Sequence, residues 1–389
     1  MTREERLELK QWLSDPKNYL KWLLYKAYLD ARKGKRKTYD EHMFEVNLWE
    51  NLDKLADAML TRKYRPGSSK AHVIFNPVVR EIFAASFRDR VIHHFIYNEI
   101  GKWWERRFIN DSYSCTEGKG VLYGILRLQH FMRSALNEAR AKGEKAYVAK
   151  FDIKGYFMHL DRKKLLELAW AGLDRQFEGR QDSLRYEMTK FLLKQIIMDD
   201  PVKHVRQVGK KSDWKYVPKD KSLFFQPPGK GIVIGNLTSQ LLSNIFLDYA
   251  LDRFVFYDLG YRRYGRYVDD FYFVLLESQM SQFKHDLRVI ELRLKSLGVT
   301  LHPKKRYIQP VEKGAEFLGC KVYATHKVPG PRFIKNMRQA FEEVAAGRRD
   351  PATTIAYMGH AKHLNAEKLM KEAFERMGWQ YEMMRGNRR

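Results

Sequence analysis

Two runs of strand-forming residues flank an aspartate pair in the stretch GRYVDDFYFV (265–274), and this stretch constrains the fold most. Aromatic and β-branched residues such as Tyr267, Val268 and Phe271 favour strands. A two-residue break between such runs predicts a tight β-hairpin with Asp269 and Asp270 at its tip. Because aspartate is also a common turn residue, the pair alone does not establish a function.

The charge balance favours a polyanionic partner. The 389 residues carry a formal net charge of +25 at pH 7, an excess that opposes compaction and attracts nucleic acid. The basic residues are densest in ARKGKRK (31–37), GKKSDWKYVPKDK (209–221), HPKKR (302–306) and RGNRR (385–389). A membrane-surface protein would instead concentrate its charge on one amphipathic helix.

Other features of the composition exclude several classes of protein. No apolar run approaches the roughly 20 residues that cross a bilayer, and the charged start MTREERLELKQWL lacks the apolar core of a signal peptide. Cys115 and Cys320 are far apart without CxxC spacing, so neither a zinc site nor a disulfide framework is expected. We therefore expect a protein of the reducing cytoplasm.

The spacing of apolar residues predicts a helix-rich chain with short strands. Helices are expected over 1–62, 80–108, 121–141, 162–198 (a pair), 235–255 and 279–297, with a small helical bundle at the C-terminus. Strands are expected at AHVIFNP (71–77), KRYIQP (305–310) and AEFLGCKVY (315–323), and AYVAKFDIKGYF (146–157) is expected to be a buried strand that runs into a turn. A long basic loop is expected before Gly231.

A further carboxylate, Asp152, ends the predicted strand YVAKFD at the edge of a sheet. Strand-end and hairpin-tip carboxylates that lie side by side offer oxygen ligands for hard divalent cations. Two such ions about 3.5–4 Å apart serve in-line phosphoryl transfer. One activates an attacking 3′-hydroxyl, and the other neutralises charge on the leaving pyrophosphate.

These stretches, taken in order with several others, resemble the reverse transcriptases over nearly the whole chain. FDIKGYF (151–157) resembles the first catalytic palm motif and YVDD (267–270) the second, with the palm-helix motif IGNLTSQLLSN (234–244) between them. LGVTLHPKKRYI (297–308) and FLGCKV (317–322) resemble two later motifs, and REIFAASFRDRVIHH (80–94) the fingers motif. So many motifs in order make a chance match negligible.

The resemblance implies roles for single residues. Asp152, Asp269 and Asp270 would be catalytic and would bind two Mg²⁺ ions, for which Mn²⁺ can substitute, with the carbonyl of Ile153 as a further ligand. The nucleotide-binding residues would be Arg80 on the triphosphate, Phe157 as a steric gate that favours deoxynucleotides, Lys305 or its neighbour Lys304 near the pyrophosphate, and Ile234, Gly235 and Gln240. Phe317, Leu318 and Gly319 would form the primer grip. Ordinary core packing remains an alternative role for Phe157 and Ile234.

The resemblance also implies an α+β fold in the form of a right-hand polymerase. The expected parts are N-terminal helices and fingers at 1–145, a palm with an antiparallel sheet at 146–324, and a helical thumb at 325–389. A basic insertion at about 199–230 would interrupt the palm. The segment after the primer grip is too short for a nuclease domain of usual size, so other proteins are expected to handle integration.

The palm-helix motif narrows the family. Many relatives carry Gln before its glycine and Pro at its end, where this chain has Ile234 and Gln240. IGNLTSQ, DDPVKH (199–204), PPGKGIV (227–233) and YMGHAKHLN (357–365) are similar to reverse transcriptases of diversity-generating retroelements. That family copies a template RNA into cDNA with errors opposite adenines, and works with a small basic pentameric accessory protein. The expected partners are therefore template RNA, cDNA or primer, dNTPs and that accessory protein, with no membrane, in a bacterial, archaeal or phage-infected cell.

Two alternatives stay open. Another prokaryotic reverse transcriptase, of phage-defence, retron or group II intron type, would share the palm motifs, although retron and intron enzymes usually keep Pro where this chain has Gln240. A non-catalytic scaffold that binds structured RNA would share the charge but would not need three aspartates. Near-identical DNA repeats beside the gene, differing mainly at adenines, would identify the diversity-generating type.

Overall fold

The computed structural model describes residues 2–34, 38–75 and 78–378, which fall into two compact units. Unit 1 combines Met1–Ile109, Lys154–Phe254 and Arg293–Thr300, and unit 2 combines Asn110–Ile153, Val255–Leu292 and Leu301–Arg389. The basic residues at 35–37 and 385–389 lie outside the described residues. The boundaries expected for fingers, palm and thumb stay a prediction.

Unit 1 is mainly helical, and capping side chains explain where several helices begin. Its helices are α1 (Arg3–Ser14), α2 (Pro16–Ala31), α3 (Tyr39–Val46), α4 (Leu48–Leu60), α5 (Phe87–Glu105), α7 (Tyr156–His159), α8 (Arg162–Gln176), α9 (Leu184–Met198) and α10 (Leu237–Leu247). Asp15, Ser86 and Asp161 each accept a backbone hydrogen bond from the first turn of α2, α5 and α8, respectively. The helices predicted within 1–62 and 162–198 are confirmed.

A three-stranded sheet in unit 1 shows that the helix predicted over 80–108 is wrong at its start. β1 (Lys70–Ile74) pairs antiparallel with β2 (Arg80–Ala84) and parallel with β4 (Arg206–Gln207). Residues 80–84 are therefore strand, and α5 begins only after Ser86. Apolar residues such as Ile82 and Phe83 suit a helix or a strand locally, and pairing with β1 decides between them. β1 confirms the predicted strand up to Ile74, and residues 76–77 lie outside the described residues.

The basic loop predicted before Gly231 is ordered by short turns: η1 (Pro201–His204), η2 (Lys211–Tyr216), η3 (Lys219–Lys221) and η4 (Leu223–Phe225). Its inward side chains belong to a small apolar cluster. The buried members are Ala71, Phe83, Met158, Leu223 and Val233, and packed against them are Phe157, Trp214, Phe224 and Ile234, among others. The loop is therefore held on the three-stranded sheet.

The helix predicted at 235–255 begins after Asn236, although the Asn236 side chain makes no capping hydrogen bond. Beyond Leu247 the chain continues as two π-helical segments, Asp248–Asp252 and Phe254–Asp258. Such segments are rare and often mark functional regions.

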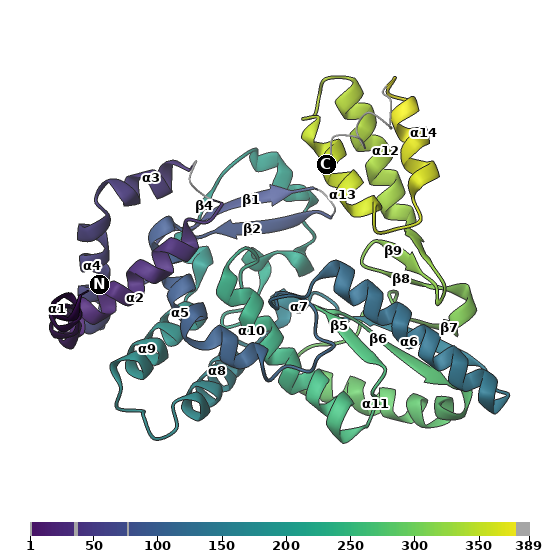
Figure 1. Ribbon diagram of the computed structural model, residues 1–389, viewed down its shortest axis with the longest axis horizontal. Helices are drawn as coiled ribbons and strands as arrows, with labels where there is room; N and C mark the ends of the chain where they lie inside the picture. The colour runs from purple at the N-terminus through teal and green to yellow at the C-terminus, as the bar shows by residue number, and fades with distance from the viewer. Residues whose placement is uncertain (1, 35–37, 76–77, 379–389) are drawn as a thin grey trace. The chain divides into compact units, whose positions relative to one another are not determined.

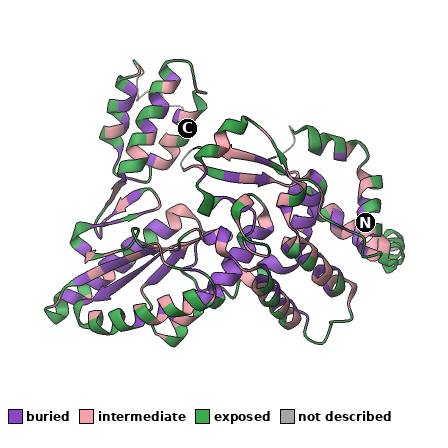
Figure 2. Ribbon diagram, turned by 180° about the vertical axis from the view of Figure 1, so that it is seen from behind, coloured by how far each residue is buried: buried purple, intermediate pink, exposed green. Residues whose placement is uncertain are grey.

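Unit 2 is centred on a four-stranded antiparallel sheet with the order β5-β6-β3-β7. Figure 1 labels three of its strands, β5, β6 and β7. Its strands are β3 (Ala146–Asp152), β5 (Tyr264–Tyr267), β6 (Asp270–Leu276) and β7 (Tyr307–Pro310). The central strands β3 and β6 are largely buried, as Figure 2 shows. The predicted hairpin and the strand that ends at Asp152 are confirmed.

α6 (Val121–Lys142) and α11 (Met280–Ser296) cover opposite faces of this sheet. Tyr272 and Val274 share an apolar core with residues of α6. On the other face, the ring of Phe283 from α11 lies 4.9 Å from that of Phe273. Because side chains alternate along a strand, Asp270 and its cross-strand neighbour Asp152 lie on the α6 face.

The C-terminal part of unit 2 adds a small sheet and a helical bundle. β8 (Ala315–Phe317), β9 (Cys320–Val322) and β10 (Lys327–Pro329) precede α12 (Pro331–Ala345), α13 (Ala352–Ala361) and α14 (Glu367–Glu375). The single strand predicted at 315–323 is wrong, because Leu318 and Gly319 adopt φ of 51° and 82° and turn the chain into a hairpin. The predicted bundle is confirmed, and residues 379–389 lie outside the described residues. Among the described helices, none is long and apolar enough to cross a membrane.

Candidate functional site

The sheet register in unit 2 brings two predicted catalytic carboxylates opposite each other. Asp152, the last residue of β3, pairs with Asp270, the first residue of β6. The next pair, Phe151 and Phe271, stacks with ring centroids 5.5 Å apart on the other face and supports this register. Asp269 lies in the turn before β6, where its carbonyl accepts a 3.0 Å hydrogen bond from the backbone N–H of Ile153. All three aspartates therefore lie at one end of the sheet.

The hairpin turn is shifted by one residue from the predicted turn. Tyr267 pairs with Asp270, so Val268 and Asp269 are the central turn residues. Val268 has φ 55°, a left-handed conformation that β-branched residues rarely adopt. The fully buried Arg266 donates hydrogen bonds to the Val268 carbonyl (2.8 Å) and to Ser112 Oγ (3.0 Å). Arg266 therefore fixes the turn, and its only sequence signal is a charge inside a strand-forming run.

Two lysines neutralise the paired carboxylates. Lys150 Nζ lies 3.0 Å from Asp270 Oδ2, and Lys305 Nζ lies 2.9 Å from Asp152 Oδ2. The structure thus places Lys305, rather than Lys304, beside Asp152. Lys150 was not predicted, although it precedes Asp152 on the same strand with its side chain on the same face.

The surroundings of Asp270 disfavour the ionised form of its carboxyl group. Burial raises the pKa of Asp270 to about 6; the Lys150 ammonium opposes this shift, while the charges of Asp269 and Asp152 add to it. The Oδ1 atom of Asp270 is buried and has no hydrogen-bond partner. A divalent cation would relieve both conditions, since carboxylate oxygens are its preferred ligands. Within the described ranges, no three His, Cys, Asp or Glu side chains are already spaced as a metal-binding cluster.

The predicted primer-grip residues lie on the same face of unit 2. Phe317 packs edge-on against Tyr272, with ring centroids 5.1 Å apart, and Lys150 Nζ lies 5.9 Å from the Phe317 ring centroid. Leu318 and Gly319 form the β8–β9 turn, where the Gly319 carbonyl accepts a 2.8 Å hydrogen bond from the Gly330 N–H.

The other predicted nucleotide-binding residues form a second group, in unit 1. Arg80 is the exposed first residue of β2, Gln240 is exposed on α10, and Phe157 and Ile234 are half-buried against the apolar cluster. The carbonyl of Ile234 accepts a 2.9 Å hydrogen bond from the Phe83 N–H. Gly235 has φ 129°, and a Cβ there would lie 2.6 Å from the Phe83 carbonyl oxygen. The close approach of β2 therefore requires glycine at position 235.

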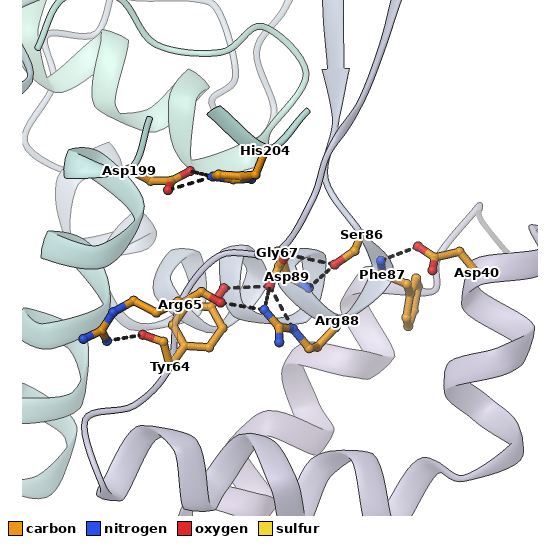
Figure 3. Close-up of polar contacts among 10 residues, drawn as sticks. All are labelled: Asp40, Tyr64, Arg65, Gly67, Ser86, Phe87, Arg88, Asp89, Asp199 and His204. Carbon is orange, nitrogen blue, oxygen red and sulfur yellow. Dashed lines mark hydrogen bonds and ion pairs between the residues drawn. The ribbon is translucent and has the colours of Figure 1, made fainter. Parts of the chain in front are cut away.

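Asp89 is a buried polar residue that sequence analysis did not single out (Figure 3). Its carboxylate accepts hydrogen bonds from Tyr64 Oη (2.9 Å), the Gly67 N–H (2.8 Å) and Ser86 Oγ (2.8 Å), and pairs with Arg88. Although burial acts to raise it, these partners, with Arg88 foremost, hold the pKa of Asp89 below its usual range. Asp89 thereby ties the segment that leads into β1 to the start of α5. The Ser86–Asp89 spacing of a helix cap was the available signal.

A small cavity in unit 1 lies beside this network and is lined in part by Asp89, His93, Arg162 and Thr238. Its volume of about 50 Å³ is far below the several hundred Å³ of small-molecule pockets, so we do not assign it a nucleotide. His93 Nδ1 lies 2.8 Å from Thr238 Oγ1, and burial lowers the pKa of His93 to about 4.

Comparisons with known proteins add little to these observations. No protein-family model matches the chain, and no curated protein is significantly similar to it. Among solved structures, telomerase from Candida albicans, in complex with a fragment of telomeric RNA, is similar with 13% identity and a TM-score of 0.43. The match covers 72% of this chain and 50% of the telomerase chain, so this chain spans about half of its length. Because a TM-score below 0.5 is too low to assign a common fold, function must be inferred from the residues of the chain itself.

Proposed function

We propose that this protein is an RNA-directed DNA polymerase, which extends a primer with deoxynucleotides along an RNA template. The observation that carries the proposal is that Asp152, Asp269 and Asp270 all lie at one end of an antiparallel sheet. Carboxylates in such an arrangement suit hard divalent cations and phosphoryl transfer. The reverse-transcriptase motifs around them and the net charge of +25 support a nucleic-acid substrate.

In this proposal the residues of unit 2 prepare the site for chemistry. When bound, two Mg²⁺ ions would supply the charge that activates the 3′-hydroxyl and neutralises the leaving pyrophosphate. Asp152, Asp269 and Asp270 would hold them, with the carbonyl of Ile153 as a further ligand. Lys150 and Lys305 form ion pairs with Asp270 and Asp152. Once metal ions were bound by these carboxylates, Lys305 would be free to approach the pyrophosphate. Arg266 keeps the turn, and with it Asp269, in place.

Residues of unit 1 would select the nucleotide. Arg80 is exposed, and its guanidinium suits a bidentate contact to the triphosphate. Phe157 packs against the apolar cluster, which limits the movement of its ring, so the ring can exclude a 2′-hydroxyl. The Ile234 side chain is bulky but cannot form a hydrogen bond. Its presence would reduce the difference in binding free energy between correct and incorrect base pairs.

The finer proposal is a diversity-generating retroelement, in which cDNA with errors at template adenines replaces part of a target gene. It is supported by Ile234, Gln240 and the IGNLTSQ, DDPVKH and YMGHAKHLN stretches. The small basic pentameric accessory protein would be a partner. Paired DNA repeats that differ mainly at adenines, next to the gene, would support this type over other prokaryotic reverse transcriptases.

Primer extension on an RNA homopolymer with Mg²⁺ and the matching dNTP tests the general proposal. Asp270→Asn should lower the extension rate by at least about 1,000-fold, equivalent to about 4 kcal/mol, while RNA binding stays near wild type. The matched control Asp182→Asn makes the same charge change at an exposed loop residue and should extend at the wild-type rate. Wild-type extension by Asp270→Asn would refute the assignment.

A further inference from the structure

Exposed aromatic rings and lysines lie beside one another in two sets in unit 1, one that includes the residue after β1 and one in the loop before Gly231. We define the aromatic–lysine platform as Phe75, Lys215, Tyr216, Lys219 and Phe225. Its three rings are large apolar groups in solvent, since Phe75 is 44%, Tyr216 54% and Phe225 59% exposed. Exposed rings that pack against each other, as Phe75 and Tyr216 do, call for an occupant.

The rings and cations of the platform contact one another in pairs. Phe75 and Tyr216 pack edge-to-face with centroids 5.8 Å apart. Lys215 Nζ lies 5.0 Å from the Tyr216 centroid, and Lys219 Nζ lies 5.5 Å from that of Phe225. Each exposed loop ring thus has a cation beside it, the combination that suits a stacked base and its phosphate.

Inward-facing neighbours hold the platform rigidly. Next to the exposed Phe225, Phe224 turns inward, and its ring lies 5.1 Å from that of Trp214 and 5.8 Å from that of Phe83. The Leu223 N–H donates a 2.9 Å hydrogen bond to the buried Glu81 of β2. The rings are therefore presented on a fixed support, which lowers the entropy lost on binding.

The charge around the platform is strongly positive. Residues 203–225 contain seven Lys and Arg, all exposed, and two Asp. Lys203 lies 3.9 Å from Asp200, and within the described part of the chain the other six form no ion pair. Cations that are not held in an ion pair with a carboxylate are available for phosphates.

We propose that the aromatic–lysine platform binds single-stranded template RNA, with bases stacked on Tyr216, Phe225 and Phe75 and phosphates against Lys215 and Lys219. This inference rests on the proposed polymerase function, and names the surface that receives its template. A template must be held whatever its sequence, and stacking on rings is tolerant of sequence. The platform shares its apolar support with Phe157 and Ile234, which places it next to the predicted nucleotide-binding residues.

Binding of a fluorescent, unstructured pyrimidine RNA to the full chain tests the rings. We expect Tyr216→Ala/Phe225→Ala to bind at least about tenfold more weakly than wild type. The matched control is Tyr39→Ala/Trp49→Ala, which removes two rings of unit 1 that are 79% and 58% exposed, and should change affinity less than about twofold. Phe225→Ala alone, with an unchanged melting temperature, keeps the test valid should the double variant fold poorly.

The salt dependence of binding tests the lysines. Lys215→Gln/Lys219→Gln should reduce the slope of log affinity against log salt by about 1.4, since each phosphate of a single strand contributes about 0.7. The control Lys10→Gln/Lys102→Gln alters two exposed lysines elsewhere in unit 1 and should leave the slope unchanged. If both double variants reduced the slope equally, the result would contradict the claim that Lys215 and Lys219 bind the RNA phosphates specifically.

The outcomes separate this inference from the proposed function. If the ring variants bind RNA like wild type while wild type extends primers, the platform inference is wrong and the polymerase proposal stands. If wild type extends no primer but the ring variants lose RNA affinity, the platform binds RNA and the polymerase proposal fails. Competition by polyglutamate as strong as that by RNA, unaffected by the ring variants, would indicate an acidic protein partner and overturn the inference.

Discussion

Ile234 stands where many of the reverse transcriptases that the proposed function invokes carry Gln before the motif glycine. Its backbone is held by the hydrogen bond from the Phe83 N–H, so a side-chain substitution should leave the local fold intact. Ile234→Gln would add one polar contact that favours correct pairs. A contact of about 1.4 kcal/mol changes an error ratio about tenfold.

We therefore expect Ile234→Gln to lower misinsertion by up to about tenfold, most visibly opposite template adenine, with overall extension largely retained. The measurement is sequencing of cDNA copied from an adenine-containing RNA, with Ile355→Gln, at an isoleucine that is 52% exposed, as control. Wild-type errors no more frequent at adenine than at other bases would count against the diversity-generating type. Frequent errors that Ile234→Gln does not change would refute only this role of Ile234.

His93 makes stability depend on pH. Its pKa is lowered by burial to about 4 in the folded chain, against about 6.5 when unfolded, so the unfolded state binds the proton first. Above pH 6.5 His93 is neutral in both states and does not reduce the free energy of unfolding. As pH falls from 6.5 towards 4, the unfolded state binds the proton and the free energy of unfolding decreases. Between pH 7 and pH 5 the loss should be about 2 kcal/mol.

Urea denaturation at both pH values measures this loss. From pH 7 to pH 5, the free energy of unfolding of wild type should fall by about 2 kcal/mol more than that of His93→Gln, because glutamine cannot take up the proton. His285→Gln, at an exposed histidine, should behave like wild type. Equal losses in wild type and His93→Gln would show that His93 does not carry the effect.

At the scale of elements, the β5–β6 hairpin holds backbone strain at the candidate active site. Val268 has a positive φ at the first central turn position, where type II′ turns favour glycine. Val268→Gly should raise the free energy of unfolding by about 1 kcal/mol, because left-handed strain costs about that much. If the strain positions Asp269, primer extension should slow at the same time.

The matched comparison for this prediction is Val268→Ala, which removes the same methyl groups but keeps the left-handed penalty. Chemical denaturation of both variants separates strain from packing. Val268→Gly being less stable than Val268→Ala would contradict the proposed strain.

Elements with local signals were predictable, and those that depend on distant pairing were not. Ser86 and Asp89 mark the start of α5, yet the apolar spacing of 80–108 suggested a longer helix, since only β1 makes residues 80–84 a strand. Similarly, AEFLGCKVY contains strand formers throughout, and the turn at Leu318 and Gly319 is what divides it.

At the scale of the whole molecule, the register of one sheet explains why the three aspartates were predictable and their neighbours were not. Motif order and strand-end positions predicted Asp152, Asp269 and Asp270 together, and the β3–β6 pairing brings them to one end of the sheet. The contacts of Lys150 and Arg266 depend on the face of the sheet to which each side chain points and on the residues that pack against that face. Such contacts follow only once the strands are paired.

RNA-directed nucleotide addition by wild type is the measurement that tests the central claim most directly. Four primed RNA templates that differ only in the first templating base would each be given the four dNTPs and Mg²⁺, and the added nucleotide would be identified by sequencing. We predict the complementary nucleotide opposite U, G and C, and a mixture opposite A. No addition, or addition of the same nucleotide on every template, would contradict the account.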